Sequence, residues 1–197
     1  MHDAPFSHAC ENNKAPILEV LQRVFIDATK ALEIGSGTGQ HAIHFAPQLP
    51  HLVWQPSDRE CNIPGINCWL DKHPVANLKS PVTLDVSHDT WPEANAIFSA
   101  NTAHIMSWEL VQKTFEQVGK TLPPKGIFAL YGPFNYHGKY TSDSNQMFDR
   151  MLRERDPKQG IRDFEAINTL AEKANLKLIE DNTMPANNRL LVWKKIR

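Results

Sequence analysis

One acidic residue and three glycines stand at a fixed spacing early in the sequence, as Glu33-x-Gly35-x-Gly37-x-Gly39. The segment around them, Lys30–Ala46, predicts a short buried parallel strand, a glycine-rich turn and the first turns of a helix. Such a turn brings backbone N–H groups and a helix N-terminus to the carboxyl end of the strand, where they can bind a polar ligand. Glycine allows the tight turn and lets a ligand approach the main chain without meeting a Cβ atom.

Two further features of this turn bear on the kind of ligand. The dinucleotide-binding fingerprint places a glycine or alanine where this chain has Gln40, which argues against a pyrophosphate ligand. Glu33 lies inside the strand, where a carboxylate is costly unless a partner compensates its charge. A tight turn with a chance acid is the alternative, but the agreement of four constrained positions in a strand–loop–helix context favours a ligand site.

The same pattern resembles motif I of the class I S-adenosylmethionine-dependent methyltransferases. The resemblance implies S-adenosylmethionine as the cofactor and S-adenosylhomocysteine as the product. It also implies that Glu33 helps to hold the methionine ammonium, directly or through water. The loop residues would line the ligand: Gly35, Ser36, Gly37 and Gly39.

A second acid ends the next predicted strand, Leu52–Ser57. Asp58 follows Gly39 by roughly 20 residues, the usual distance at which an acid meets a ribose, and a carboxylate can accept hydrogen bonds from both ribose hydroxyls. The alternative is a cap for the predicted helix Ile63–Lys72. We expect ribose binding from the position of Asp58, while Arg59 either stacks on the adenine or faces solvent.

A third acid, Asp85, closes the short predicted strand Val82–Leu84. The methyltransferase resemblance implies that Asp85 binds the adenine amino group and that the N–H of Val86 meets a ring nitrogen. The alternative is that Asp85 caps the turn Ser87–Asp89.

The end of the fourth predicted strand, Ala96–Ala100, carries polar residues that would face both cofactor and substrate. Asn101 matches the motif IV position of the family, and it is a candidate for both cofactor binding and catalysis. Amino-methylating members often carry Pro, Pro and an aromatic residue after it, whereas this chain has Thr-Ala-His, which argues against nitrogen methylation. His104 is a candidate general base, with a structural histidine as the alternative. Trp108, in the first turn of the next helix, is a candidate substrate contact.

The segment Gly132–Gly160, after the fifth predicted strand, is longer than a plain connection and rich in aromatic and polar residues. We expect it to be a substrate lid, with an insertion that covers the sheet edge as the alternative. The candidate substrate contacts here are Tyr131, Asn135 and Tyr136, and His137 is a second candidate base.

The first 29 residues combine a leader that is polar and helix-poor, Asp3–Asn13, with a predicted helix, Pro16–Ala28, whose apolar positions recur at helical spacing. The leader is either a frayed terminus or a flap over the cofactor. In a flap, Asn13 or its neighbour Asn12 would bind the methionine carboxylate.

Two predicted strands near the end, Leu176–Asp181 and Arg189–Lys195, surround an Asn-rich turn and form an antiparallel hairpin. The predicted fold is therefore an α/β, Rossmann-like single domain over residues 1–197. It has a mostly parallel seven-stranded sheet with a C-terminal antiparallel hairpin and helices on both faces. The hairpin and Gln40 both argue against a nicotinamide-dependent oxidoreductase.

Composition narrows the function classes further. Lys plus Arg number 21 against 22 for Asp plus Glu, a net charge of −1 that argues against a broad nucleic-acid face. No apolar run reaches membrane-spanning length, and the three cysteines lack a C-x-x-C spacing. We expect a cytoplasmic protein without a metal, because the histidines His41, His44 and His51 lack a metal-binding pattern.

The resemblance extends along almost the whole chain. The runs EIGSGTGQHAIHFA, WQPSDR, SANTAHI and YGPFNYHGKYTSDSN are similar to a small family catalogued as a domain of unknown function, whose animal branch is called methyltransferase-like protein 26. This implies the class I fold but supplies no substrate. We expect methyl transfer to an unidentified acceptor, most simply a small molecule. The alternative is a catalytically silent module that holds the cofactor or a protein partner, and the oligomeric state stays open.

Overall fold

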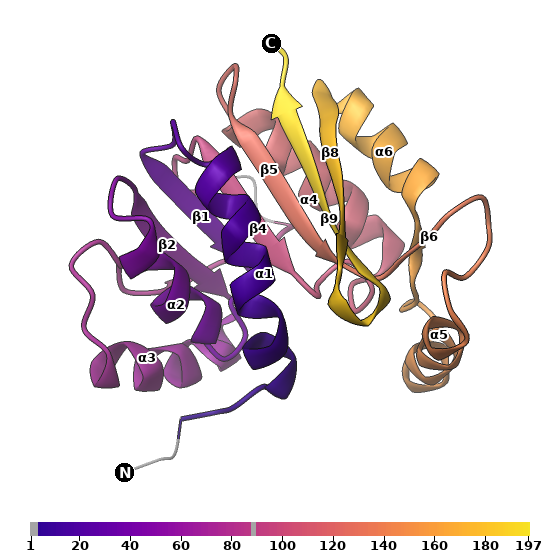
Figure 1. Cartoon of the computed structure of the whole chain (residues 1–197), viewed down its shortest axis with the longest axis horizontal. Helices are drawn as coiled ribbons and strands as arrows, with labels where there is room; N and C mark the ends of the chain where they lie inside the picture. Colours follow the sequence, from indigo (N-terminus) through magenta and orange to yellow (C-terminus); the bar gives the residue numbers. More distant parts are fainter. Residues whose placement is uncertain (1–3, 88–89) are drawn as a thin grey trace.

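Within residues 4–87 and 90–197, which the computed structural model describes, seven strands form one sheet in the order β3-β2-β1-β4-β5-β9-β8 (Figure 1). The first five strands pair in parallel, and β9 is antiparallel to both β5 and β8. The predicted mostly parallel sheet with a terminal hairpin is confirmed. The strands are β1 (Lys30–Ile34), β2 (Val53–Asp58), β3 (Val82–Thr83), β4 (Ala96–Ala100), β5 (Ile127–Gly132), β8 (Leu176–Met184) and β9 (Asn188–Lys195).

Helices cover both faces of this sheet. In Figure 1, α1 and α2 lie in front of the strands and α4 and α6 lie behind them. The strands alternate accordingly: Phe98 packs with Phe45 and Trp54 on the front face, while Phe128 packs with Phe115 on the other. The helices are α1 (His8–Val24), α2 (Gln40–Gln48), η1 (Glu60–Asn62), α3 (Ile63–Lys72), α4 (Trp108–Thr121), α5 (Asp143–Arg155), α6 (Phe164–Lys173) and η2 (Pro185–Asn187).

The N-terminal helix begins earlier than the sequence predicts. The leader was expected to be helix-poor up to Asn13, but α1 starts at His8, with the side chain of Ser7 accepting a hydrogen bond from the N–H of Cys10 at 3.4 Å. Pro16 therefore lies inside the helix, where it cannot donate a backbone hydrogen bond.

The segment after β5 contains structure of its own. Residues Phe134–Asn135 (β6) pair with Arg162–Asp163 (β7), and α6 begins directly after β7, at Phe164. Helix α5 lies apart from the sheet, beside the turn between β8 and β9 (Figure 1). The Nδ2 group of Asn145 donates to the carbonyl oxygen of Asn187 at 3.2 Å and joins the two.

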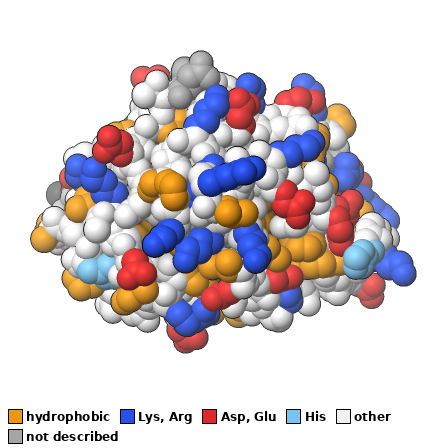
Figure 2. Space-filling view, turned by 90° about the horizontal axis from the view of Figure 1, so that it is seen from above, with side chains coloured by type: hydrophobic (Ala, Val, Ile, Leu, Met, Phe, Trp, Pro, Cys, Tyr) orange, Lys and Arg blue, Asp and Glu red, His pale blue; other side chains and the backbone are white. Residues whose placement is uncertain are grey.

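The edge at which the parallel strands begin is seen from above in Figure 2. Basic side chains gather near the middle of this face among hydrophobic ones, and acidic side chains lie beside them. Of the helices in the described part of the chain, none is both long and apolar enough to cross a membrane.

Candidate functional site

A cleft of about 1410 Å³ opens at the opposite edge, where the parallel strands end. Its two ends differ in the elements that line them. The glycine end is formed by the loop after β1, the loops after β2 and β3, and the start of α1. The α5 end is formed by the loop after β4, by α5 with the residues that follow it, and by the turn between β8 and β9.

The three loop glycines have different surroundings. Gly35, Gly37 and Gly39 all have positive φ angles, of 71°, 58° and 89°. A Cβ atom on Gly35 would lie 2.7 Å from Cγ2 of Thr102, whereas one on Gly37 would meet nothing within 4 Å. Gly35, Ser36 and Gly37 line the cleft. Gly39 does not, which corrects its expected place: it caps α2 and packs against Ile66.

Asp58 connects the loop after β2 to the glycine loop. Its carboxylate is buried, and Oδ2 accepts the N–H of Gly37 at 2.7 Å. Oδ1 accepts from the N–H of Arg59 at 2.7 Å and from Nδ2 of Asn62 at 2.8 Å. A carboxylate has about four acceptor positions, so these three bonds leave one, on Oδ2, for a ligand in the cleft. Arg59 lines the cleft beside it and is exposed.

Glu33 lies beneath this end and is not among the residues that line the cleft, which favours contact through water over the direct contact that was also expected. Its side chain is 1% exposed, and Oε2 accepts from Nε1 of Trp54 at 3.0 Å. Burial raises the pKa of Glu33 to about 7, against the hydrogen bonds from Trp54 and Ser36, and the nearby Asp58 raises it further. Near neutral pH this carboxyl is therefore protonated in a substantial fraction of the molecules.

Asp85 and Val86 both line the glycine end of the cleft. Oδ1 of Asp85 accepts from the N–H of Ser87 at 2.9 Å and from its hydroxyl at 2.6 Å. These bonds match the turn-capping alternative, although His88 and Asp89 of that turn lie outside the described residues. Val86 is buried, and it forms part of the apolar wall.

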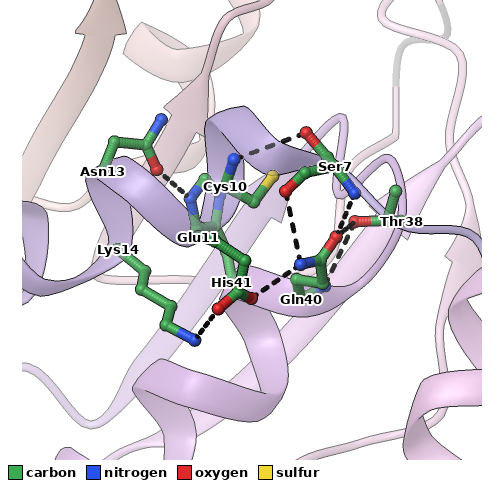
Figure 3. Close-up of polar contacts among 8 residues, drawn as sticks. All are labelled: Ser7, Cys10, Glu11, Asn13, Lys14, Thr38, Gln40 and His41. Atoms are coloured by element: carbon green, nitrogen blue, oxygen red, sulfur yellow. Dashed lines mark hydrogen bonds and ion pairs between the residues drawn. The ribbon is translucent and has the colours of Figure 1, made fainter.

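Gln40 fastens the start of α1 to the glycine loop (Figure 3). The side chain is 1% exposed. Its Oε1 accepts the N–H of Ser7 at 2.6 Å and the hydroxyl of Thr38 at 3.0 Å, and its Nε2 donates to Oε1 of Glu11 at 2.7 Å and to the carbonyl oxygen of Ser7 at 3.4 Å. The sequence excluded a dinucleotide loop at this position but did not reveal this role.

A buried polar chain continues from α1 across the floor of the cleft. Oδ1 of Asn13 lies 2.7 Å from Nε2 of His41 (Figure 3), and Asn13 and Asn188 both hydrogen-bond the Tyr131 hydroxyl. Burial, with smaller contributions from His44 and Lys14, lowers the pKa of His41 to about 4, so this ring is neutral at pH 7. Asn13, His41 and Tyr131 all line the cleft, and His41 had no predicted role.

His104 is the candidate base that the structure brings into the cleft. The residue is 6% exposed, and its ring meets Phe148 edge-on with centroids 5.3 Å apart. Burial, followed by the charges of Arg162 and Arg155, lowers the pKa of His104 to about 4. The imidazole is therefore neutral at pH 7. Asn101, in the same loop after β4, also lines the cleft. Its backbone has a left-handed φ of 59°, which asparagine tolerates.

Besides Gly39 and Glu33, four more predicted site residues are not among those that line the cleft. The side chain of His137 is 83% exposed in a turn, with Nδ1 3.2 Å from Glu165. Because β6 pairs with β7, the buried Asn135 lies in that small sheet, and the Tyr136 hydroxyl donates to Asp181 at 2.9 Å. Trp108 packs against the Arg162 guanidinium, which lies 5.8 Å from the ring centroid. These placements correct the expected substrate contacts and the second candidate base.

Among the described residues, no cluster of three or more His, Cys, Asp or Glu side chains could hold a metal ion. The sequence also left several residues of the α5 end unnamed. They lie on three separate segments and carry no local motif: Ser144, Phe148, Arg155, Lys158 and Asn188.

A comparison with known protein families places the chain in one of them. Residues 4–195 match the family model described as "Protein of unknown function (DUF938)". The chain belongs to this family. A family of unknown function was expected, while the relation to its animal branch stays a prediction.

Solved structures with the same fold are methyltransferases. An O-methyltransferase family 2 protein from Planctomyces limnophilus, in complex with apigenin, superposes with a TM-score of 0.84 at 14% identity, covering 95% of this chain and 58% of that one. An O-methyltransferase family protein from Burkholderia thailandensis gives a TM-score of 0.81 at 12% identity, covering 92% and 55%. Human N-acetylserotonin methyltransferase in complex with SAM gives 0.72 at 15% identity, covering 93% and 55%.

These likenesses establish the class I methyltransferase fold that the sequence predicts. At identities of 12% to 15% they show the fold alone. The chain spans 55% to 58% of the length of these three proteins, so their activities and ligands do not transfer directly.

Proposed function

We propose that the protein transfers the methyl group of S-adenosylmethionine to a small-molecule acceptor. The observation that carries the proposal is the pairing of Asp58 with the N–H of Gly37 at the glycine end of a large cleft. A carboxylate with an acceptor position left suits a ribose hydroxyl. The open space beside Gly37, where a Cβ would meet nothing within 4 Å, suits a ligand lying against the main chain.

Each part of the glycine end has a role in this proposal. Asp58 would bind the ribose, and Asp85 with Val86 would border the adenine. Glu33 would bind the methionine ammonium from below through a water molecule, because its carboxylate does not line the cleft. A bound cation above it would favour its ionised form. When bound, S-adenosylmethionine supplies an electrophilic methyl group without the help of a metal.

The α5 end would bind the acceptor. His104 would accept the proton of a hydroxyl or thiol acceptor, because its neutral ring borders the cleft. The known neighbours include O-methyltransferases, which favours an oxygen acceptor. This role also agrees with the Asn-Thr-Ala-His sequence after β4, which differs from that of amino-methylating enzymes.

Two segments that cover the cleft complete the proposal, within a single domain over residues 1–197. The start of α1, held by Gln40, would act as a flap over the cofactor, with Asn13 on its cleft side. Helix α5, within residues 132–160, would act as the substrate lid, since Asn145 and Phe148 line the cleft. The first section of the chain would then control cofactor access and the later one acceptor access.

The cofactor is tested by thermal-shift titration with S-adenosylmethionine, S-adenosylhomocysteine and NAD. A ligand at a hundredfold over its dissociation constant adds about 2.7 kcal/mol of stability. We expect this shift with both adenosyl ligands, none with NAD, and its loss in Asp58→Ala. The control Asp71→Ala removes an exposed acid from α3 and should keep the shift. Absence of any adenosyl shift in the wild type would overturn the proposal.

The base is tested by comparing His104→Gln with His137→Gln in methyl-transfer assays over an acceptor panel. Loss of a general base lowers the rate about 100-fold or more. We expect that loss in His104→Gln, and unchanged transfer in His137→Gln because the ring of His137 lies outside the cleft. Adenosyl binding without transfer to any acceptor would instead support the silent binding module.

A further inference from the structure

Positive charge gathers at the α5 end of the cleft. Arg155 and Lys158 both line it. Within residues 4–87 and 90–197, neither side chain takes part in an ion pair. The Arg155 guanidinium donates to the amide oxygen of Gln159 from Nε at 3.1 Å and from Nη2 at 2.6 Å. Because guanidinium has five N–H donors, it keeps donors for a ligand.

The nearby acids offset this charge only in part. Asp156 lines the same end, where its Oδ1 accepts the N–H of Lys158 at 2.9 Å. Glu109 is exposed, does not line the cleft and lies near Lys158 and Arg162. Arg162 adds a third cation, whose guanidinium donates to three backbone carbonyl oxygens. The α5 end therefore carries more positive than negative charge.

Apolar and aromatic side chains line the cleft at the same end as these cations. Phe148 meets the ring of His104 edge-on, and Ile105 and Met106 line the cleft beside them. Aromatic rings pair with other planar groups in offset-stacked or edge-to-face geometry, and Phe148 lines the cleft where such a group could pack against it. A ring placed against Phe148 would lie in the same part of the cleft as Arg155 and Lys158.

The cations also act on His104 itself. Arg162 and Arg155 lower the pKa of its imidazole, in addition to the larger effect of burial. An anion bound in the cleft beside Arg155 would offset part of this positive charge and raise the pKa of His104, which would make it a stronger base. A negatively charged acceptor would thus raise the basicity of His104, the residue that takes its proton.

We infer that the α5 end binds a small planar organic anion, and that the methyl acceptor belongs to this class. Arg155 and Lys158 hold the anionic group, and the ring of the acceptor lies against Phe148. Its hydroxyl faces His104. This inference rests on the proposed function for its catalytic meaning, but the binding of the anion can be measured separately.

The test uses calorimetric titration of the full chain, with and without saturating S-adenosylhomocysteine. The probes are 4-hydroxybenzoate, its uncharged counterpart 4-hydroxybenzamide, and phenyl phosphate, which separates carboxylates from phosphates. The variants are Arg155→Gln with Lys158→Gln combined, and Arg150→Gln as the control. Arg150 is an exposed cation on the same helix that does not line the cleft. The control therefore detects a general effect of charge on α5.

We expect an anionic probe to bind at least about tenfold more tightly than the amide, the effect of a hydrogen bond to a charged group. The combined variant should remove this difference, and Arg150→Gln should keep it. Three results would each overturn the inference. The first is equal binding of 4-hydroxybenzoate and 4-hydroxybenzamide, and the second is a preference for the anion that survives in the combined variant. The third is that neither anionic probe binds at millimolar concentration. If the anion fails to bind as expected but S-adenosylhomocysteine still binds, the proposed function is retained. If S-adenosylhomocysteine does not bind, the proposed function is overturned separately.

Discussion

The two ends of the cleft are built in different ways. At the glycine end, the functional groups are backbone N–H groups and side chains with fixed partners, such as Asp58 with three donors and Gln40 with four contacts. At the α5 end, Arg155 and Lys158 are exposed, and the described contacts of the His104 ring include no hydrogen bond. The first end is preorganised and the second is open to adjustment.

This difference indicates how the protein would separate two tasks. A fixed frame suits a ligand that is the same in every turnover, because preorganised groups lose little entropy on binding. Side chains with unused hydrogen-bond donors suit recognition of the methyl acceptor, to which they can adjust. Substitutions at the glycine end should therefore change the stability of the protein, and those at the α5 end should mainly change ligand choice.

The largest effect on stability is expected at Glu33. Its pKa rises from 4.5 to about 7 on folding, so the native state favours the protonated form. Stability then falls as the pH rises from about 4.5 to about 7, by about 3 kcal/mol in all, and stays low above that. Glu33→Gln should therefore be about 3 kcal/mol more stable than the wild type at pH 8 and nearly equal to it at pH 4.5.

Urea unfolding at the two pH values measures this difference. The control Glu60→Gln changes an exposed acid in η1, and it should alter stability little at either pH. The same gain for Glu33→Gln at both pH values would contradict a titrating buried carboxyl.

The next effect distinguishes two glycines of one loop. Gly35→Ala adds a Cβ that would lie 2.7 Å from Thr102, in a residue with φ of 71°. Gly37→Ala has the strained φ of 58° but no contact. We expect losses of about 2 kcal/mol and about 1 kcal/mol in unfolding free energy, since the left-handed region costs roughly 1 kcal/mol and the clash adds to it. Thermal unfolding tests the order, and equal losses would contradict the close approach of Thr102 to Gly35.

A smaller and more local effect is expected at Gln40. Gln40→Ala leaves the N–H of Ser7 without its partner, which costs about 1 kcal/mol. Amide hydrogen exchange should accelerate in Ser7–Asn13 and change little in α4. Gln40→Glu keeps the shape but sets a carboxylate beside Glu11, so it should accelerate exchange further. Unchanged exchange in both variants would show that other contacts hold the flap.

The smallest effect is expected at the α5 end. Arg155 is exposed and bonds only a neutral amide among its described partners, so Arg155→Gln should change unfolding free energy by less than about 0.5 kcal/mol. Chemical denaturation checks this value. A loss as large as that of Gly35→Ala would mean that this end is as fixed as the other, and the comparison would fail.

The sequence predicts the glycine end well because its information is local. A glycine at positive φ, an acid after a strand and the distance between them are all properties of neighbouring residues, as in Gly37 and Asp58. The sheet was predictable for the same reason, since short apolar strands alternate with amphipathic helices. The start of α1 was missed because the helix-poor composition of the leader outweighed the Ser7 cap.

The α5 end was harder to predict because tertiary packing assembles it. His137 and Tyr136 follow β5 closely, but the pairing of β6 with β7 turns them away from the cleft. Arg155 enters the cleft because α5 lies beside the turn of the terminal hairpin, an arrangement that no short motif encodes. The structural role of Gln40 was not predicted either. Its residue type argued against a pyrophosphate ligand, but its hydrogen bonds with Ser7 and Glu11 join residues far apart in the sequence, and no local pattern indicates them.

The place of β9 in the sheet has a consequence for synthesis on the ribosome. β9 follows every other strand in the sequence, yet it lies between β5 and β8. Until it emerges, β5 presents an unpaired edge and β8 lacks the neighbour with which it pairs, a state prone to association with other chains. The Tyr131 hydroxyl also lacks Asn188 until then. The newly made chain therefore completes its cleft and joins β8 to the rest of its sheet in the same late step.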